Sequence, residues 1–243
     1  MEDKSKDELL EDLRVIIETL KASLPTEAPL IFSNAIDPAR ALHLREACLH
    51  RIAELAESAY DAFVKKNYVP AYLLSRAVME TLALFWYFCD KLEDAIKTQD
   101  LEHIREMLSK ALTGAKAAKA KEVGYSLDPI HILKLIRHVA KFAPPFEHHY
   151  DFLSEVSHPN AAGLTSAYVR IDRDRKMVYF GKEHGRFVSL LELDLRALAT
   201  NLNAFMDLYD RSAEQFKKFQ ELCEDVGKDQ DLPLSEPDTT VSR

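Results

Sequence analysis

The chain has 243 residues, of which 47% are hydrophobic and 30% are charged, and its formal net charge is −8. A chain of this length can bury about 70% of the surface that it exposes when unfolded, so its apolar content excludes a disordered protein. It contains six glycines, which argues against turn-rich all-β folds and against glycine-lined phosphate loops.

The first part of the chain predicts three helices. Residues 1–24 contain apolar side chains at the i, i+3, i+4 and i+7 spacing of an amphipathic N-terminal helix. Asp37 followed by Pro38 is typical of an N-cap and a first-turn proline, and predicts a long helix to about Asn67. Pro70 then begins a strongly apolar helix.

The middle of the chain predicts three shorter helices. Residues 100–122 have a weaker helical pattern that becomes rich in lysine and alanine. Residues 130–142 follow a second Asp-Pro pair, and residues 146–157 follow a Pro-Pro break. Proline, asparagine and glycine in the segment 159–163 are expected to end the last of these helices.

In the last part of the chain the hydrophobic pattern changes from a helical period to that of β-strands. Two short β-rich runs, AYVRID and MVYFG, flank a polar turn and predict a β-hairpin near residues 166–181. A long amphipathic helix follows over residues 188–223, and the acidic, proline-containing residues 224–243 predict a disordered tail. The expected fold is an all-α bundle of six to eight helices over residues 37–223, with the small hairpin as an insert.

Cysteine usage and hydropathy indicate a cytoplasmic protein. The three cysteines have no paired spacing and each falls in a helical apolar pattern, which is typical of reduced, buried thiols. The N-terminus lacks the apolar core of a secretory signal. The most apolar segment, Ala71–Cys89, carries Arg76 and Glu80 near its middle, so we expect a core helix and no membrane partner.

Arg76 and Glu80 are the first candidate site residues. They are four residues apart, so their side chains can meet on one face of the apolar helix. Two charges in such a helix need a partner or a hydrogen bond. They are interpreted either as a buried pair that fixes helix packing or as a polar centre that orients a catalytic or ligand-binding group.

The helix EHHYDFLSEVSHPN carries the second candidate. At 100° per residue, His148, Asp151, Glu155 and His158 fall within an arc of about 80°. Such a stripe suits general acid–base catalysis or a divalent metal, and the alternative is a solvated polar face. His158 also ends the helix before a proline, where the helix dipole favours the imidazolium.

Other motifs of metal and cofactor sites are absent. The chain has one Glu-x-x-His sequence, whereas a di-iron carboxylate bundle needs two. Zinc-binding cysteine pairs, glycine-rich phosphate loops and the Gly-x-Ser-x-Gly elbow are not present. No metal or cofactor is therefore predicted.

Two segments together resemble a known group of proteins. SRAVMETLALFWYF (Ser75–Phe88) and YDFLSEVSHPNAAG (Tyr150–Gly163) resemble uncharacterised bacterial helical proteins related to the HEPN-like superfamily, in which an Arg-x3-Glu helix precedes a Tyr-x2-Leu-Ser-x3-His-Pro segment. The resemblance implies a helical bundle, a homodimer and a cytoplasmic location. Some HEPN relatives are metal-independent ribonucleases of toxin or phage-defence systems with an Arg-x4–6-His motif.

The chain departs from that nuclease motif. No arginine stands five to seven residues before His158, and the one formal match, Arg45 to His50, is expected by chance in a chain of this composition. On this resemblance, Arg76 would stabilise phosphate charge, His158 would act as general acid or base, and Glu80 would hold Arg76. Lysines near 116–121 would contact an RNA backbone.

The same interpretation places three arginines of the hairpin against RNA, namely Arg170, Arg173 and Arg175. The net negative charge does not exclude such a partner, because residues 105–141 carry eight bases and three acids. The predicted activity is therefore RNA binding or metal-independent RNA cleavage in a stress or phage-defence context.

The alternative is a non-catalytic helical dimerisation or interaction module. Its buried polar network would hold the helices together, and the acidic tail would bind a protein partner. The residues of this network are Arg76, Glu80, Tyr150, Ser154 and His158, with Asn160 beside them.

Overall fold

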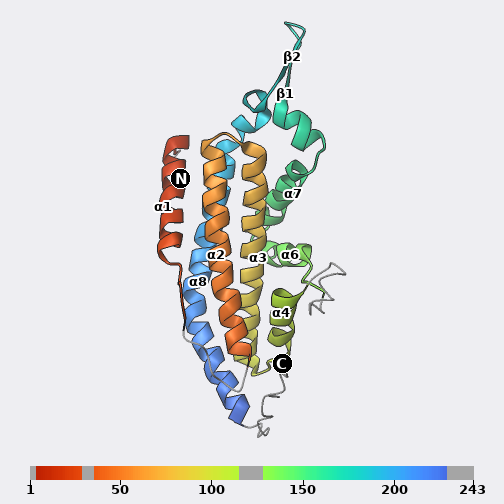
Figure 1. The fold of residues 1–243 in the computed structure, drawn as a ribbon. Coiled ribbons are helices and arrows are strands. Elements are labelled where there is room, and N and C mark those ends of the chain that lie inside the picture. Colours follow the sequence, from red (N-terminus) through yellow and green to blue (C-terminus); the bar gives the residue numbers. More distant parts are fainter. Residues whose placement is uncertain (1–3, 29–35, 115–127, 229–243) are drawn as a thin grey trace, which may run out of the picture.

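The computed structural model describes residues 4–28, 36–114 and 128–228. These residues form seven α-helices: α1 (Lys6–Ala22), α2 (Asp37–Val64), α3 (Tyr68–Thr98), α4 (Glu102–Thr113), α6 (Ile132–Ala140), α7 (Pro145–Ser157) and α8 (Leu191–Lys228). The long helices α2, α3 and α8 run side by side, with α1 along one flank and α4, α6 and α7 along the other (Figure 1). The predicted all-α bundle with a small β insert is confirmed.

Several helix ends differ from the prediction, and two of these differences affect the tail or the packing. α8 continues to Lys228, so residues 224–228 extend the helix instead of beginning a tail, and residues 229–243 lie outside the described part. Asp37 is the first residue of α2 and makes no N-cap hydrogen bond. Its buried carboxylate instead accepts a hydrogen bond from Arg105 Nε at 2.6 Å, which ties the start of α2 to α4.

α3 is the central helix of the bundle. It packs against α2, α4, α6, α7 and α8, because apolar side chains lie on nearly all of its faces. At its middle, the fully buried ring of Phe85 lies 4.8 Å from Phe205 of α8 and 5.8 Å from Phe88, measured between ring centroids. This aromatic cluster joins α3 to α8 in the core.

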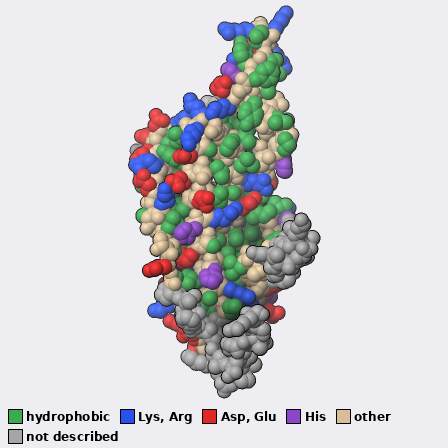
Figure 2. All heavy atoms as spheres, in the orientation of Figure 1, with side chains coloured by type: hydrophobic (Ala, Val, Ile, Leu, Met, Phe, Trp, Pro, Cys, Tyr) green, Lys and Arg blue, Asp and Glu red, His purple; other side chains and the backbone are tan. Residues whose placement is uncertain are grey.

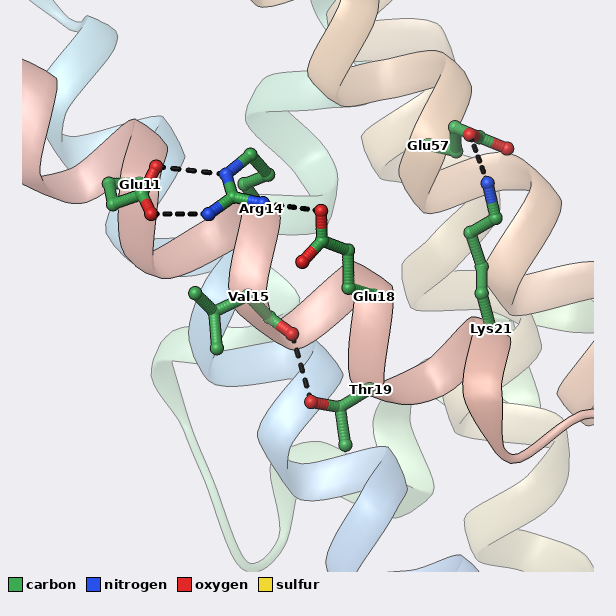
Figure 3. Close-up of polar contacts among 7 residues, drawn as sticks. All are labelled: Glu11, Arg14, Val15, Glu18, Thr19, Lys21 and Glu57. Carbon is green, nitrogen blue, oxygen red and sulfur yellow. Dashed lines mark hydrogen bonds and ion pairs between the residues drawn. The ribbon is translucent and has the colours of Figure 1, made fainter.

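α1 covers the outer side of α2 and α8. Its buried stripe consists of Leu9, Leu13, Ile17 and Leu20, which is the spacing that predicted the helix. The opposite side carries ion pairs of Arg14 with two acidic neighbours of α1, and Lys21 reaches Glu57 of α2 at 2.5 Å (Figure 3). Such exposed pairs contribute about 0–1 kcal/mol each, so the apolar stripe holds α1 in place.

A π-helical turn, η1 (Ala161–Ser166), follows α7 where the chain was expected only to end a helix. The side-chain oxygen of Asn160 accepts hydrogen bonds from the backbone N–H groups of Ala162 and Gly163. A Cβ atom on Gly163 would lie 2.1 Å from the carbonyl oxygen of His158. Glycine is therefore required for this close approach of the backbone, and it lies inside the turn instead of ending it.

The predicted hairpin is confirmed. β1 (Val169–Asp172) pairs in antiparallel register with β2 (Met177–Phe180), within the expected residues 166–181. It extends beyond the end of the helical bundle (Figure 1). The segment then returns through two short 3-10 turns, η2 (Lys182–His184) and η3 (Arg186–Ser189), to α8.

The cysteines follow the prediction of buried, reduced thiols. Cys48, Cys89 and Cys223 are free and buried, and burial raises the pKa of each thiol to about 12. In the described part of the chain, every helix is too short or too polar to cross a membrane.

Replacement of Phe85 tests the central packing. We expect Phe85→Ala to lower the free energy of unfolding by about 3–5 kcal/mol, because it leaves a cavity in the middle of the aromatic cluster. Phe142→Ala removes the same atoms from an exposed ring and should cost less than about 1 kcal/mol. Urea unfolding of both variants measures the difference, and equal losses would contradict the central role of α3.

Candidate functional site

Arg76, Glu80 and Tyr150 form a polar cluster between α3 and α7. Arg76 Nη2 donates to the hydroxyl of Tyr150 at 3.1 Å, and this hydroxyl donates to Glu80 Oε1 at 2.9 Å. Arg76 Nε lies 3.2 Å from the same carboxylate oxygen. The predicted pairing of Arg76 with Glu80 is thus present, and Tyr150 is the partner that both share.

The hydroxyl of Tyr150 serves as both acceptor and donor in this cluster. Tyr150 is 2% exposed, and its burial raises the pKa of the phenol, so that it stays protonated and can donate to Glu80. The side chains of Arg76 and Glu80 are 28% and 29% exposed. The cluster therefore holds α7 against α3 at the edge of the core, where each charge keeps partial access to water.

His158 and Ser154 do not join this cluster. His158 is exposed at the end of α7, and no hydrogen bond or ion pair of its side chain is present within the described residues. It stands eight residues after Tyr150, which corresponds to about 12 Å along a helix axis. Ser154 donates to the backbone oxygen of Tyr150 in its own helix. The prediction of a single buried network that includes both of these side chains is therefore wrong.

The stripe on α7 is a solvated polar face. His148, Asp151, Glu155 and His158 are all exposed. Glu155 accepts a hydrogen bond from the side-chain amide of Asn160 at 2.7 Å, which links it to the cap of the π-helical turn. Within the described residues, no three histidine, cysteine, aspartate or glutamate side chains gather in a way that could hold a metal ion.

The three arginines of the hairpin are exposed, as an RNA-contacting role would need. The guanidinium of Arg170 lies over the ring of Tyr179, 4.6 Å from its centroid, while Arg173 and Arg175 lie in the turn. Lys and Arg side chains mark the tip of the hairpin in Figure 2. Asp172 and Asp174 alternate with them and reduce the local positive charge. The lysines near 116–121 lie outside the described residues.

Arg45 and His50, the formal nuclease-type match, have separate structural partners. Arg45 lies over the ring of Tyr209 at 3.7 Å and donates to Ser212 Oγ at 2.9 Å, which ties α2 to α8. His50 contacts the backbone oxygen of Pro25 at 2.8 Å. The two side chains therefore serve unrelated contacts, as expected if the Arg-x4-His match arose by chance.

A second site, which no motif indicated, is a cavity of about 640 Å³ between α7 and α8. Both helices pack on α3 but make few contacts with each other, so a groove remains between them. Its walls are mainly apolar, with a few polar side chains that include His149 of α7 and Asp194 and Asn201 of α8.

Asp194 is a buried carboxyl at this cavity. It is 3% exposed, and its Oδ2 atom accepts a hydrogen bond from the hydroxyl of Tyr72 at 2.5 Å. Burial raises the pKa of Asp194 to about 6, and the hydrogen bond from Tyr72 opposes this increase. Burial also lowers the pKa of His149, so this imidazole is neutral at neutral pH.

One sequence signal could have identified Asp194. The buried stripe of α8 includes Leu191, Leu195, Leu198 and Leu202. Asp194 belongs to the same stripe, because it stands three residues after Leu191 and four before Leu198. An acidic residue at a core position of an amphipathic helix needs an explanation. Its partner Tyr72 gives no such signal, because tyrosine is common in apolar helices.

No protein-family model, curated protein or solved structure matches this chain. The resemblance to the HEPN-like superfamily therefore rests on the two sequence segments alone and stays a prediction.

The polar cluster can be tested by removing one oxygen atom. We expect Tyr150→Phe to lower the free energy of unfolding by about 1–3 kcal/mol, because two charged groups lose their shared hydrogen-bond partner. His158→Ala should change it by less than about 0.5 kcal/mol, since its side chain is exposed. Chemical unfolding compares the two variants; a larger loss in His158→Ala would contradict the arrangement described.

Asp194 makes stability depend on pH. Its pKa is higher in the folded chain than in the unfolded chain, so the folded chain binds the extra proton, and the free energy of unfolding falls as pH rises from about 4 to about 6. The loss amounts to about 3 kcal/mol at most, from the rise of the pKa from 3.8 to about 6.

In Asp194→Asn this fall should be absent, whereas Asp207→Asn, at an exposed position of the same helix, should keep it. Urea unfolding at pH 4.5 and pH 7 measures both. Parallel pH dependence of wild type and Asp194→Asn would show that the carboxyl is not held in an apolar setting.

Proposed function

We propose that the protein is a non-catalytic helical interaction module that forms a homodimer through its β-hairpin. The observation that carries this proposal is an apolar face of the hairpin that the bundle leaves uncovered. Three further points support it: the geometry of that face, the position of the hairpin charges, and the commitment of Arg76 and Glu80 to Tyr150.

The register of the hairpin separates its side chains into two faces. Cross-strand partners lie on the same face of a sheet. The pairs Val169–Phe180 and Ile171–Val178 therefore form one face, and Arg170–Tyr179 and Asp172–Met177 form the other. The first of these, called the apolar face below, contains no polar side chain.

The apolar face is open to solvent. Ile171, Val178 and Phe180 are 65%, 46% and 72% exposed. A two-stranded hairpin is at best marginally stable in water by itself, and exposed apolar patches mark interaction sites. Covering this face would remove both unfavourable features.

A second copy of the chain is the partner that fits best. Two identical apolar faces can meet around a two-fold axis, and the charged strand residues Arg170 and Asp172 then point away from the contact. The arginine-bearing turns lie at opposite ends when the hairpins cross in antiparallel fashion. The contact is small beside a standard interface of about 1,600 Å², so the dimer should depend on concentration.

The candidate catalytic groups support a structural role. Tyr150 engages both Arg76 and Glu80, so these charges already have a partner inside the protein. His158, the expected general acid or base, is exposed and has no side-chain partner among the described residues, whereas catalytic imidazoles are held by a second group.

RNA binding is the second candidate function. The exposed arginines at the hairpin tip favour it, because arginine side chains neutralise backbone phosphates. The interspersed aspartates weaken this attraction, so we rank it below the dimer.

Two neighbouring substitutions test the dimer. Val178 lies on the apolar face and Met177, with a similar exposure of 51%, lies on the opposite face. We expect Val178→Lys to raise the dissociation constant of the dimer by about tenfold or more, and Met177→Lys to change it by less than about twofold, since tenfold corresponds to about 1.4 kcal/mol. Sedimentation equilibrium over a range of concentrations measures both.

A monomer at all concentrations, or equal effects of the two substitutions, would contradict the proposed interface. A separate incubation with mixed cellular RNA, with and without EDTA, tests the absence of catalysis. RNA cleavage that persists in EDTA and is lost in a folded His158→Ala variant would contradict the proposed non-catalytic role. It would show instead that the protein is a metal-independent ribonuclease.

A further inference from the structure

We infer that the cavity between α7 and α8 binds a small hydrophobic amine, with an aromatic body among its apolar walls and an ammonium group at Asp194. This site shares no residue with the hairpin interface, so it does not depend on the proposed dimer.

The size and walls of the cavity fit a small organic molecule. Its volume of about 640 Å³ lies within the range of about 300–1,000 Å³ that ligand pockets occupy. α3 contributes Met79, Leu82 and Trp86, and α7 contributes Phe146 and Phe152. Removal of apolar ligand surface from water supplies the main binding energy in such a site.

The charge of the walls selects a cation. Asp194 is the one acidic side chain that lines the cavity, and no lysine or arginine lines it within the described residues. The rings of Trp86, Phe146 and Phe152 can add attraction for an ammonium group placed over their faces. A carboxylate or phosphate ligand would meet the like charge of Asp194, and the basic side chains of the lining are the imidazoles of His148 and His149.

The carboxylate of Asp194 can accept more hydrogen bonds than it receives. The hydroxyl of Tyr72 is its one side-chain donor within the described residues, whereas a carboxylate offers about four acceptor positions. Asp194 lies in the first turn of α8, where the helix dipole stabilises a negative charge. The group is therefore charged near pH 7 and incompletely paired, and an ammonium ion would supply the missing donors.

The cost of this arrangement also indicates a ligand. A carboxylate held at 3% exposure beside apolar walls lowers the stability of the folded chain. An uncharged residue would fill the same place in the stripe of α8 at no such cost. Groups with strongly shifted ionisation that lie in a cleft are frequent at binding sites.

Three probes that share one ring system but differ in charge separate the contribution of the ammonium group from that of the apolar ring. 1-Naphthylmethylamine, 1-naphthylmethanol and 1-naphthoate carry charges of +1, 0 and −1 at pH 7.5, and isothermal titration measures their binding to the full chain. We expect the amine to bind at least about tenfold more tightly than the alcohol, and the naphthoate not to bind. Equal affinities for amine and alcohol, or binding of naphthoate, would overturn the inference.

Variants locate the binding. Asp194→Asn keeps an acceptor for Tyr72 but removes the charge, so it should reduce the affinity for the amine about tenfold and leave the alcohol nearly unchanged. Asp207→Asn, on an exposed part of α8, is the matched control and should bind like wild type. Unchanged binding of the amine to Asp194→Asn would contradict the site.

A bulky side chain should block the cavity. Ala197→Trp fills it from α8, and Thr200→Trp does so from an exposed position, which provides a second variant if the first does not fold. Both should lose the amine and the alcohol while their oligomeric state stays that of the wild type. If either variant instead dissociates the dimer and leaves probe binding intact, the groove is an interface between two copies and the inference fails.

Discussion

The enclosure of α3 is the constraint on which the rest of the structure depends. α3 is packed against α2, α4, α6, α7 and α8, so the polar side chains at its contacts with α7 and α8 take their partners from those helices. Tyr72 donates to Asp194 of α8, and Arg76 and Glu80 share Tyr150 of α7. α7 and α8 are thus each fixed on α3 by polar contacts within apolar surfaces, and this placement leaves the cavity between them.

The two polar contacts of α3 differ in their balance of charge. In the cluster around Tyr150, a cation, an anion and a neutral hydroxyl are all present, and water reaches the charged groups. At Asp194 a single neutral hydroxyl faces a carboxylate that is withdrawn from water. Charge in an apolar setting is costly without a counterion. The first contact therefore suits a structural role, and the second leaves a place for a cationic ligand.

The hairpin stands apart from both sites. Its register places charged and apolar side chains on different faces, so a single short element presents an uninterrupted apolar surface beyond the end of the bundle (Figure 1). The helical part supplies a rigid support for this element, since α8 leads directly from the returning segment into the core. A partner bound to the hairpin would therefore be held at a defined position relative to the groove of α7 and α8.

The sequence by itself determined the all-α bundle, the hairpin and the pairing of Arg76 with Glu80, because these follow from local periodicity, turn chemistry and a spacing of four residues. Only the tertiary structure decided that Tyr150 is their partner, that His158 is exposed, and that Asp194 meets Tyr72 across 122 positions of the chain. Contacts between distant segments depend on how helices pack and rotate about their axes, and a single sequence carries no periodic signal for that. A cavity likewise arises from the spacing of α7 and α8 on α3, which no local pattern encodes.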